Sequence, residues 1–120
     1  MSKTILIVDD SPTEVKLMMS TLTNKGYTLL TASDGEEAFT LMGKVRPDLV
    51  LLDVVMPKKN GYQVCRQIKT TAATKDVRVI LITSKNQETD RFWGLKQGAD
   101  GYLTKPYKPE DLSELVSRYA

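Results

Sequence analysis

The sequence contains no histidine and a single cysteine, Cys65. Without histidine, the chain cannot build a Ser–His or Cys–His nucleophile pair or bind a metal through imidazole. A lone cysteine cannot form a disulfide within the chain, which indicates a reducing compartment. We expect Cys65 to be a small apolar residue of a helix rather than a reactive thiol. The composition excludes several common catalytic sites and predicts a cytoplasmic protein.

The sequence also lacks long apolar runs and strongly charged segments. Its 120 residues include 17 basic and 15 acidic side chains, for a net charge of +2. Strong attraction to nucleic acid or to a membrane surface is therefore not expected. No apolar run approaches the roughly 20 residues of a membrane helix, and the segment MSKTILIVDD lacks the h-region of a signal peptide. We expect one soluble domain over residues 1–120, with neither nucleic acid nor a membrane as partner.

Short apolar segments alternate with segments of helical periodicity along the whole chain. The strand candidates are residues 5–8, 27–32, 49–52, 77–83 and 102–103, and a helix candidate follows each of them. Near-continuous apolar strands are typical of a parallel sheet that is covered on both faces. Five successive strand-then-helix units predict an α/β fold with a central five-stranded parallel sheet between two layers of helices.

Two of the predicted helices carry specific signals. Ser11, Pro12 and Glu14 indicate an N-cap, a proline in the first turn and a capping-box glutamate. The fourth helix, at about residues 87–97, is only weakly amphipathic, with Phe92 and Leu95 as its one apolar face. A helix held so weakly is a candidate for movement or for contact with a partner.

Polar residues follow four of the predicted strands. Asp9 and Asp10 follow the first strand, Asp53 the third, Thr83 ends the fourth and Lys105 follows the fifth. In open α/β sheets, ligands bind beyond the carboxyl ends of the strands, so we expect these side chains to converge. Each has a structural alternative when taken alone: the acids could cap helices or end a strand, Thr83 could begin a helix, and Lys105 could lie in a turn.

The chemistry of such a cluster indicates phosphoryl transfer. Oxygen ligands without histidine or cysteine favour a hard cation such as Mg²⁺. A carboxylate beside that metal can act as a nucleophile and accept a phosphoryl group. The metal, a lysine ammonium and a hydroxyl can then neutralise the charge that spreads over the equatorial oxygens. The sequence therefore predicts a carboxylate that accepts phosphate.

Four segments carry a resemblance to a known family: ILIVDDS (5–11), DLVLLDVVMPKKNG (48–61), VILITSK (79–85) and GYLTKPY (101–107). Their order and spacing resemble the response-regulator receiver domains of two-component signalling, also called CheY-like. The resemblance implies a flavodoxin-like (βα)₅ three-layer sandwich with strand order 2-1-3-4-5. It also implies a single receiver domain over residues 1–120 without an output domain.

The resemblance assigns the acidic residues. Asp53 would be the phospho-acceptor. Asp10, Asp53 and the backbone carbonyl of Val55 would bind Mg²⁺ directly, and Asp9 would act through a metal-bound water. The protein would promote its own phosphorylation and slow dephosphorylation without acting as an enzyme on other substrates.

The resemblance also assigns the remaining residues of the site. Thr83 would hydrogen-bond the phosphoryl group, Lys105 would pair with it, and Tyr102 would be a switch aromatic that turns inward when Thr83 moves. Gly61 would occupy a turn that requires a positive φ, and the Lys105–Pro106 bond would be cis.

The partners follow from the same reading. The phosphoryl donor must be a histidine on another protein, a sensor histidine kinase or a histidine phosphotransfer domain, because this chain has none. A downstream protein would bind the face formed by the fourth helix, fifth strand and fifth helix of a monomer. The segments DDSPTE, QETDRFWGLKQGA and YLTKPY resemble PilH-type stand-alone regulators, which act in chemotaxis-like systems for type IV pilus twitching motility.

Three other functions share parts of this pattern. A receiver-like docking module could work without phosphorylation. A flavodoxin-type FMN protein would need a loop that cradles phosphate after the first strand, where Asp9 and Asp10 would repel it. A phosphatase with an aspartate nucleophile would place a second acid two residues after Asp53, where this sequence has Val55.

Overall fold

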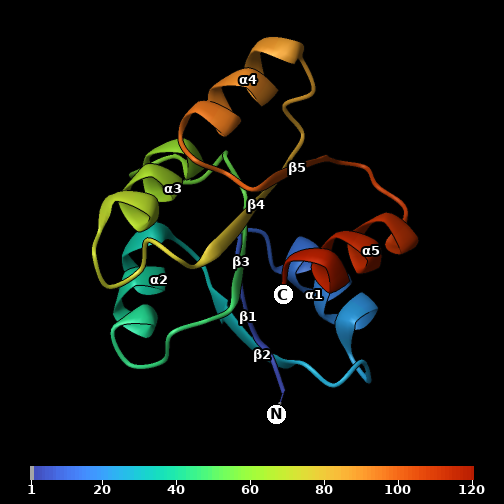
Figure 1. The fold of residues 1–120 in the computed structure, drawn as a ribbon. Coiled ribbons are helices and arrows are strands. Elements are labelled where there is room, and N and C mark those ends of the chain that lie inside the picture. Colours follow the sequence, from blue (N-terminus) through green and yellow to red (C-terminus); the bar gives the residue numbers. More distant parts are fainter. Residues whose placement is uncertain (1) are drawn as a thin grey trace.

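The computed structural model describes residues 2–120, in which strands and helices alternate along the chain (Figure 1). The strands are β1 (Thr4–Val8), β2 (Thr28–Ala32), β3 (Leu49–Leu52), β4 (Arg78–Thr83) and β5 (Gly101–Thr104). The helices are α1 (Pro12–Leu22), α2 (Gly35–Met42), α3 (Gly61–Thr70), α4 (Glu88–Lys96) and α5 (Pro109–Tyr119). All pairings are parallel, in the order β2-β1-β3-β4-β5. The predicted fold and strand order are confirmed.

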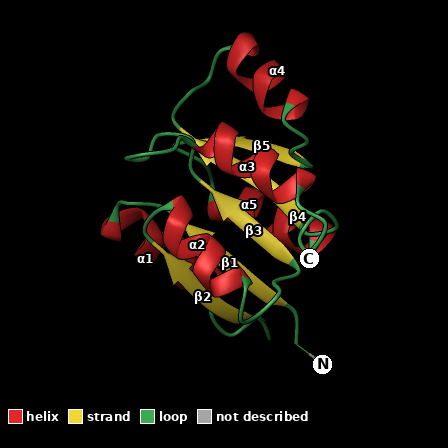
Figure 2. Ribbon diagram, turned by 90° about the vertical axis from the view of Figure 1, so that its left-hand side faces the viewer, coloured by secondary structure: helices red, strands yellow, loops and turns green. Residues whose placement is uncertain are grey.

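The sheet is covered by helices on both faces. Successive side chains of a strand point to opposite faces, and neighbours such as Leu6 and Ile7 belong to two separate apolar clusters. The cluster that includes Leu6 packs against α2 and α3, whereas the cluster that includes Ile7 packs against α1 and α5 (Figures 1 and 2). Burial on both faces explains why the strand sequences are continuously apolar. None of the helices in residues 2–120 combines the length and the apolar character needed to cross a membrane.

The start of α1 differs in part from the prediction. Ser11 is the N-cap and accepts a hydrogen bond from the backbone N–H of Glu14 at 3.4 Å, as expected. The reciprocal bond of a capping box is not formed, because the Ser11 N–H donates to Oδ1 of Asp9 at 2.9 Å. The capping box was therefore wrong, and the Glu14 carboxylate lies near Lys105 instead.

Gly61 is required for a different reason from the one expected. It does not have a positive φ; in the loop before it, Lys58 does, at 67°. A Cβ atom on Gly61 would lie 2.2 Å from the carbonyl oxygen of Asp53, which is far too close. The predicted positive φ was wrong, and close backbone approach is the cause. The predicted cis bond between Lys105 and Pro106 is present.

Helix α4 turns its smallest residue to the core. Phe92, Trp93 and Leu95 are 57%, 56% and 49% exposed, and Gly94 is the buried residue of the helix. A Cβ atom on Gly94 would lie 2.8 Å from Cδ1 of Leu81 and 3.0 Å from Cδ2 of Tyr102, so a larger residue there would require these side chains to shift. The prediction that Phe92 and Leu95 form the inner face was wrong. The bulky apolar side chains of α4 therefore face solvent, and the helix itself lies beside β5 at the edge of the sheet (Figure 2).

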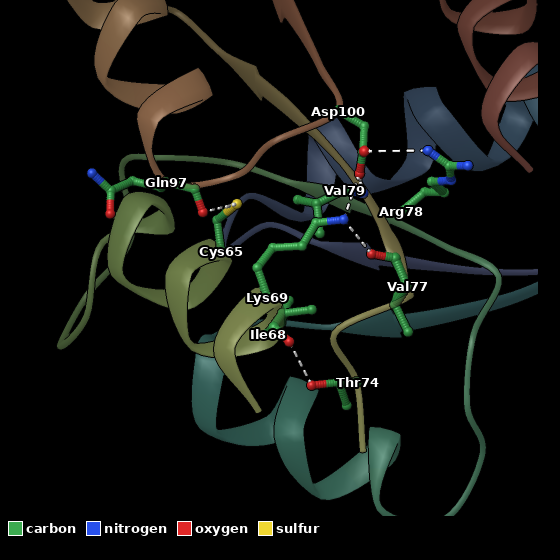
Figure 3. Close-up of polar contacts among 9 residues, drawn as sticks. All are labelled: Cys65, Ile68, Lys69, Thr74, Val77, Arg78, Val79, Gln97 and Asp100. Atoms are coloured by element: carbon green, nitrogen blue, oxygen red, sulfur yellow. Dashed lines mark hydrogen bonds and ion pairs between the residues drawn. The ribbon is translucent and has the colours of Figure 1, made fainter. Parts of the chain in front are cut away.

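A buried ion pair ties α3 to the amino ends of β4 and β5 (Figure 3). Nζ of Lys69 donates to Oδ2 of Asp100 at 2.7 Å and to the carbonyl of Val77 at 2.8 Å. Oδ2 of Asp100 also accepts the N–H of Val79 at 2.8 Å. Both charged side chains are only 17% exposed. This network joins three elements at the end of the sheet opposite the candidate site.

Cys65 lies in α3 near this network (Figure 3). Its side chain is fully buried, and burial raises the pKa of the thiol to about 12. Its Sγ contacts the carbonyl oxygen of Gln97 at 3.7 Å. A thiol with this pKa is almost entirely protonated at neutral pH, so the expectation of an unreactive packing residue is supported.

Candidate functional site

Parallel pairing brings the predicted polar residues to one edge of the sheet. Asp9, Asp53 and Lys105 directly follow β1, β3 and β5, and Thr83 is the last residue of β4. The strand ladder continues one residue further, since the Asp53 N–H donates to the carbonyl of Val8 at 3.0 Å and the Lys105 N–H to that of Thr83 at 2.8 Å. Backbone register therefore places these side chains side by side, as predicted.

The acidic residues form a compact cluster. Asp9, Asp10 and Asp53 each offer a carboxylate oxygen within 4.8 Å of the others. Asp9 and Asp53 are 2% and 8% exposed, whereas Asp10 is exposed to solvent. An oxygen-only donor set with one side open to water fits a hard cation such as Mg²⁺, which keeps several of its waters.

Lys105 lies between carboxylates. Its Nζ is 2.9 Å from Oδ2 of Asp9 and 3.6 Å from Oδ2 of Asp53, and its side chain is 14% exposed. Burial alone would lower the pKa of Lys105, but the hydrogen bond to Asp9 and the charges of Asp53, Asp9 and Glu14 outweigh it and raise the pKa. Lys105 therefore stays protonated and partly compensates the acidic cluster.

Glu14 is a further member that sequence reasoning did not place in the site. Its Oε2 lies 3.7 Å from Nζ of Lys105. The signal in the sequence is its position in the first turn of the helix that follows Asp9 and Asp10. That signal was interpreted as a capping box, which the bond between Ser11 and Asp9 replaces.

Burial dominates the electrostatics of Asp53. Burial raises the pKa of Asp53, and the charge of Asp9 adds to this effect. The charge of Lys105 and hydrogen bonds from the Val55 N–H and the Thr83 side chain act in the opposite direction without cancelling it. The Val55 N–H lies 3.3 Å from Oδ1 of Asp53. The role of the Val55 carbonyl as a metal ligand stays a prediction.

This pKa shift predicts that Asp53→Asn stabilises the metal-free protein at neutral pH. Because the folded pKa of Asp53 lies above its ordinary value of 3.8, its contribution to stability is fully present below that pH and is lost as the pH rises through the folded pKa. The asparagine variant escapes that loss. Its thermal midpoint in EDTA should exceed that of the wild type at pH 7, and the difference should shrink toward pH 4.

Asp76 provides the control, because its side chain is 75% exposed and therefore loses little contact with water on folding. Asp76→Asn should leave the thermal midpoint nearly unchanged at both pH values. A lower midpoint for Asp53→Asn than for the wild type at pH 7 would contradict the electrostatic account.

Thr83 and Tyr102 both contact the backbone of Lys85. The buried Thr83 hydroxyl accepts a hydrogen bond from the Lys85 N–H at 3.4 Å, and the Tyr102 hydroxyl donates to the Lys85 carbonyl at 2.8 Å. Tyr102 is 5% exposed, so its ring already points inward. The alternative of an exposed strand aromatic was wrong, and the role of Tyr102 in switching stays a prediction.

Known proteins with similar sequences belong to one family, which agrees with this geometry. The sequence profile of the response regulator receiver domain matches residues 5–117. The chain is 45% identical over 113 residues to Protein PilH of Pseudomonas aeruginosa, covering 94% of this chain and 93% of PilH. It is also 40% identical over 116 residues to the regulatory protein PhoP of alkaline phosphatase synthesis in Bacillus subtilis. That match covers 97% of this chain but 48% of PhoP, so the chain spans about half of that transcriptional regulator.

Solved structures agree with the sequence matches. The chemotaxis protein CheY4 of Vibrio cholerae superposes with a TM-score of 0.92 at 30% identity and covers 100% of both chains. A response regulator from Chloroflexus aurantiacus superposes with a TM-score of 0.94 at 31% identity, covering 99% of this chain and 98% of that one. An acidic cluster beside a buried lysine, on this fold and with these relatives, leads to one conclusion: the chain belongs to the response regulator receiver domain family.

Proposed function

We propose that Asp53 accepts a phosphoryl group in a Mg²⁺-dependent reaction and that this modification changes a protein-binding surface. One observation carries the proposal: Nζ of Lys105 lies 3.6 Å from Oδ2 of Asp53, beside the cluster of carboxylate oxygens from Asp9, Asp10 and Asp53. The donor would be a phosphohistidine on a sensor kinase or a phosphotransfer domain. Its P–N bond breaks as a P–O bond forms to the Asp53 carboxylate.

The residues of the chain have distinct roles in this reaction. Asp10, Asp53 and the Val55 carbonyl would hold Mg²⁺ directly and Asp9 through water. When bound, the metal offsets negative charge on the transferring oxygens. Lys105 supplies a fixed positive charge 3.6 Å from Oδ2 of Asp53, where its 2.9 Å bond to Oδ2 of Asp9 holds it.

The modified carboxylate would then attract nearby groups. A phosphoryl group adds close to two negative charges and three acceptor oxygens. Lys105 would pair with these oxygens, and the Thr83 hydroxyl, which accepts from the Lys85 N–H, would donate a hydrogen bond to them. Only such differential contacts can shift a conformational equilibrium.

The output surface would be the face of α4, β5 and α5. Its α4 part presents the exposed side chains of Phe92, Trp93 and Leu95, and aromatic side chains of this kind are enriched at protein interfaces. Similarity to PilH over 93% of its length supports a stand-alone regulator in chemotaxis-like or pilus motility signalling. We propose that it works in the cytoplasm as a monomer.

The test is phosphorylation by a small donor. The protein is incubated with Mg²⁺ and acetyl phosphate, and intact masses are measured beside Asp53→Asn. The wild type should gain one phosphoryl group, whereas the variant and an EDTA-treated sample should gain none. Equal gain in Asp53→Asn would place the acceptor elsewhere. No gain, repeated with a cognate kinase, would remove the proposal.

A second candidate function is a docking module that works without phosphorylation. The inward position of Tyr102, which is 5% exposed and bonded to the Lys85 carbonyl, favours it, because the output face then already has the arrangement expected after switching. In that case Asp53→Asn would bind the downstream partner with wild-type affinity.

A further inference from the structure

Two tyrosine hydroxyls bind backbone carbonyls in the first turn of α4 and in the segment before it. Tyr102 of β5 donates to the carbonyl of Lys85 at 2.8 Å, and Tyr62 of α3 donates to the carbonyl of Asp90 at 2.9 Å. Since only the smallest residue of α4, Gly94, is buried, apolar packing contributes little to holding the helix. Its position therefore depends strongly on these two polar contacts. The proposed switch involves Tyr102 but not Tyr62.

Tyr62 is joined closely to the loop that carries Asp53. The preceding residue, Gly61, donates its N–H to the carbonyl of Val54 at 2.8 Å. A Cβ atom on Gly61 would lie 2.2 Å from the carbonyl oxygen of Asp53 and 2.7 Å from Cα of Val54. Backbone packed this tightly cannot shift on one side only. A displacement of the Asp53 loop must therefore move the start of α3, where Tyr62 is the second residue.

We propose that Tyr62 is a positioning residue that forms a second link between the Asp53 loop and α4, running through the start of α3 to the Asp90 carbonyl, beside the contact of Tyr102 with the Lys85 carbonyl. The inference rests on the proposed function, since it describes how phosphorylation of Asp53 reaches the output face. Along this route, the Asp53 loop moves Gly61, Gly61 moves Tyr62, and the Tyr62 hydroxyl moves α4 through Asp90.

Trp93 provides an internal reporter for this link. It is the only tryptophan of the chain, it lies on α4 at 56% exposure, and it packs edge-on against Phe92 with the ring centroids 6.2 Å apart. A shift of α4 against its surroundings should change the emission of Trp93. Four proteins are compared before and after adding acetyl phosphate with Mg²⁺: the wild type, Tyr62→Phe, Tyr102→Phe and the double variant.

Tyr62→Phe keeps the ring and removes only the hydroxyl. We expect it to reach the same phosphorylated fraction by intact mass as the wild type, with the Trp93 emission change reduced at least about twofold. The double variant should lose more than either single variant, because the two hydroxyls hold different carbonyl groups, those of Asp90 and Lys85. Tyr27→Phe, a partly buried tyrosine of the other apolar cluster, is the control and should respond like the wild type.

Hydrogen exchange of residues 88–96 tests the tether without any phosphodonor. These amides should exchange several-fold faster in Tyr62→Phe than in the wild type or in Tyr27→Phe. The link alone would be overturned if phosphorylated Tyr62→Phe showed the full change in Trp93 emission. It would also be overturned if the hydrogen exchange of residues 88–96 were the same in Tyr62→Phe as in the wild type. A wild type that cannot be phosphorylated would overturn the proposed function and the link together.

Discussion

Gly61→Ala should abolish phosphoryl acceptance and destabilise the fold by about 3 kcal/mol, at the upper end of the usual cost of inserting a methyl group into packed structure. The added Cβ would lie 2.2 Å from the carbonyl oxygen of Asp53, which belongs to the backbone, and the position of the Cβ is fixed by the backbone of residue 61. No side-chain rotation can relieve the overlap, so the Asp53 loop or the start of α3 must move. Because Gly61 also donates its N–H to the Val54 carbonyl, we expect the two segments to move together and the Asp53 carboxylate to shift relative to Lys105 and the acidic cluster.

Gly43→Ala is the matched control. Gly43 ends α2 with an ordinary helical φ of −70°, and a Cβ there would meet its nearest atom, the Thr40 carbonyl oxygen, at 3.5 Å. We expect its unfolding free energy to lie within about 0.5 kcal/mol of the wild type and its phosphorylation to be unchanged. Urea denaturation and intact mass measure both properties. If Gly61→Ala had the stability and the phosphorylation of the wild type, the predicted overlap with the Asp53 carbonyl would be contradicted.

Lys69→Met should lower the unfolding free energy by about 3–5 kcal/mol, the usual cost of removing one partner of a buried ion pair. Methionine keeps the apolar stem but leaves Asp100 without its 2.7 Å contact and the carbonyl of Val77 without its donor. Since Lys69 lies at the end of the sheet opposite Asp53, the variant should still accept a phosphoryl group wherever it remains folded. Urea denaturation with the mass assay separates the two properties.

Arg78→Met tests the same carboxylate from its exposed side. Nη1 of Arg78 lies 3.5 Å from Oδ1 of Asp100, but its side chain is 57% exposed. Surface ion pairs contribute little, so we expect a loss below about 1 kcal/mol. Equal losses in Lys69→Met and Arg78→Met would mean that burial does not set the strength of this network.

The fold and the main site could be predicted because both follow from the order of residues along the strands. Continuous apolar segments such as Leu49–Leu52 indicate strands buried on both faces. The carboxyl ends of parallel strands share one edge, so residues that directly follow them, such as Asp9 and Asp53, must meet there. The predicted convergence needed no knowledge of side-chain packing.

The errors concern residues whose neighbours compete for the same space or for the same hydrogen bond. The apolar face expected for α4 was wrong because Tyr102 and Leu81 already fill the space beneath the helix, and Gly94 packs against them. The capping role of Glu14 was wrong because Asp9 takes the Ser11 N–H first. Leu81 and Tyr102 lie outside α4 in the sequence, whereas Asp9 is only two residues before Ser11, so the second error came from choosing between two local hydrogen bonds.

The sequence alone therefore determined the α/β architecture, the strands and the acidic, hydroxyl and ammonium groups of the site, because these depend on periodicity and on position relative to strand ends. Only the tertiary structure decided that Glu14 faces Lys105, that Gly61 must lack a side chain because of the Asp53 carbonyl, and that Tyr62 reaches Asp90. The physical reason is that close contacts between segments form or fail with differences in position of a few tenths of an ångström. These positions are set by the packing of the whole core and not by any one segment.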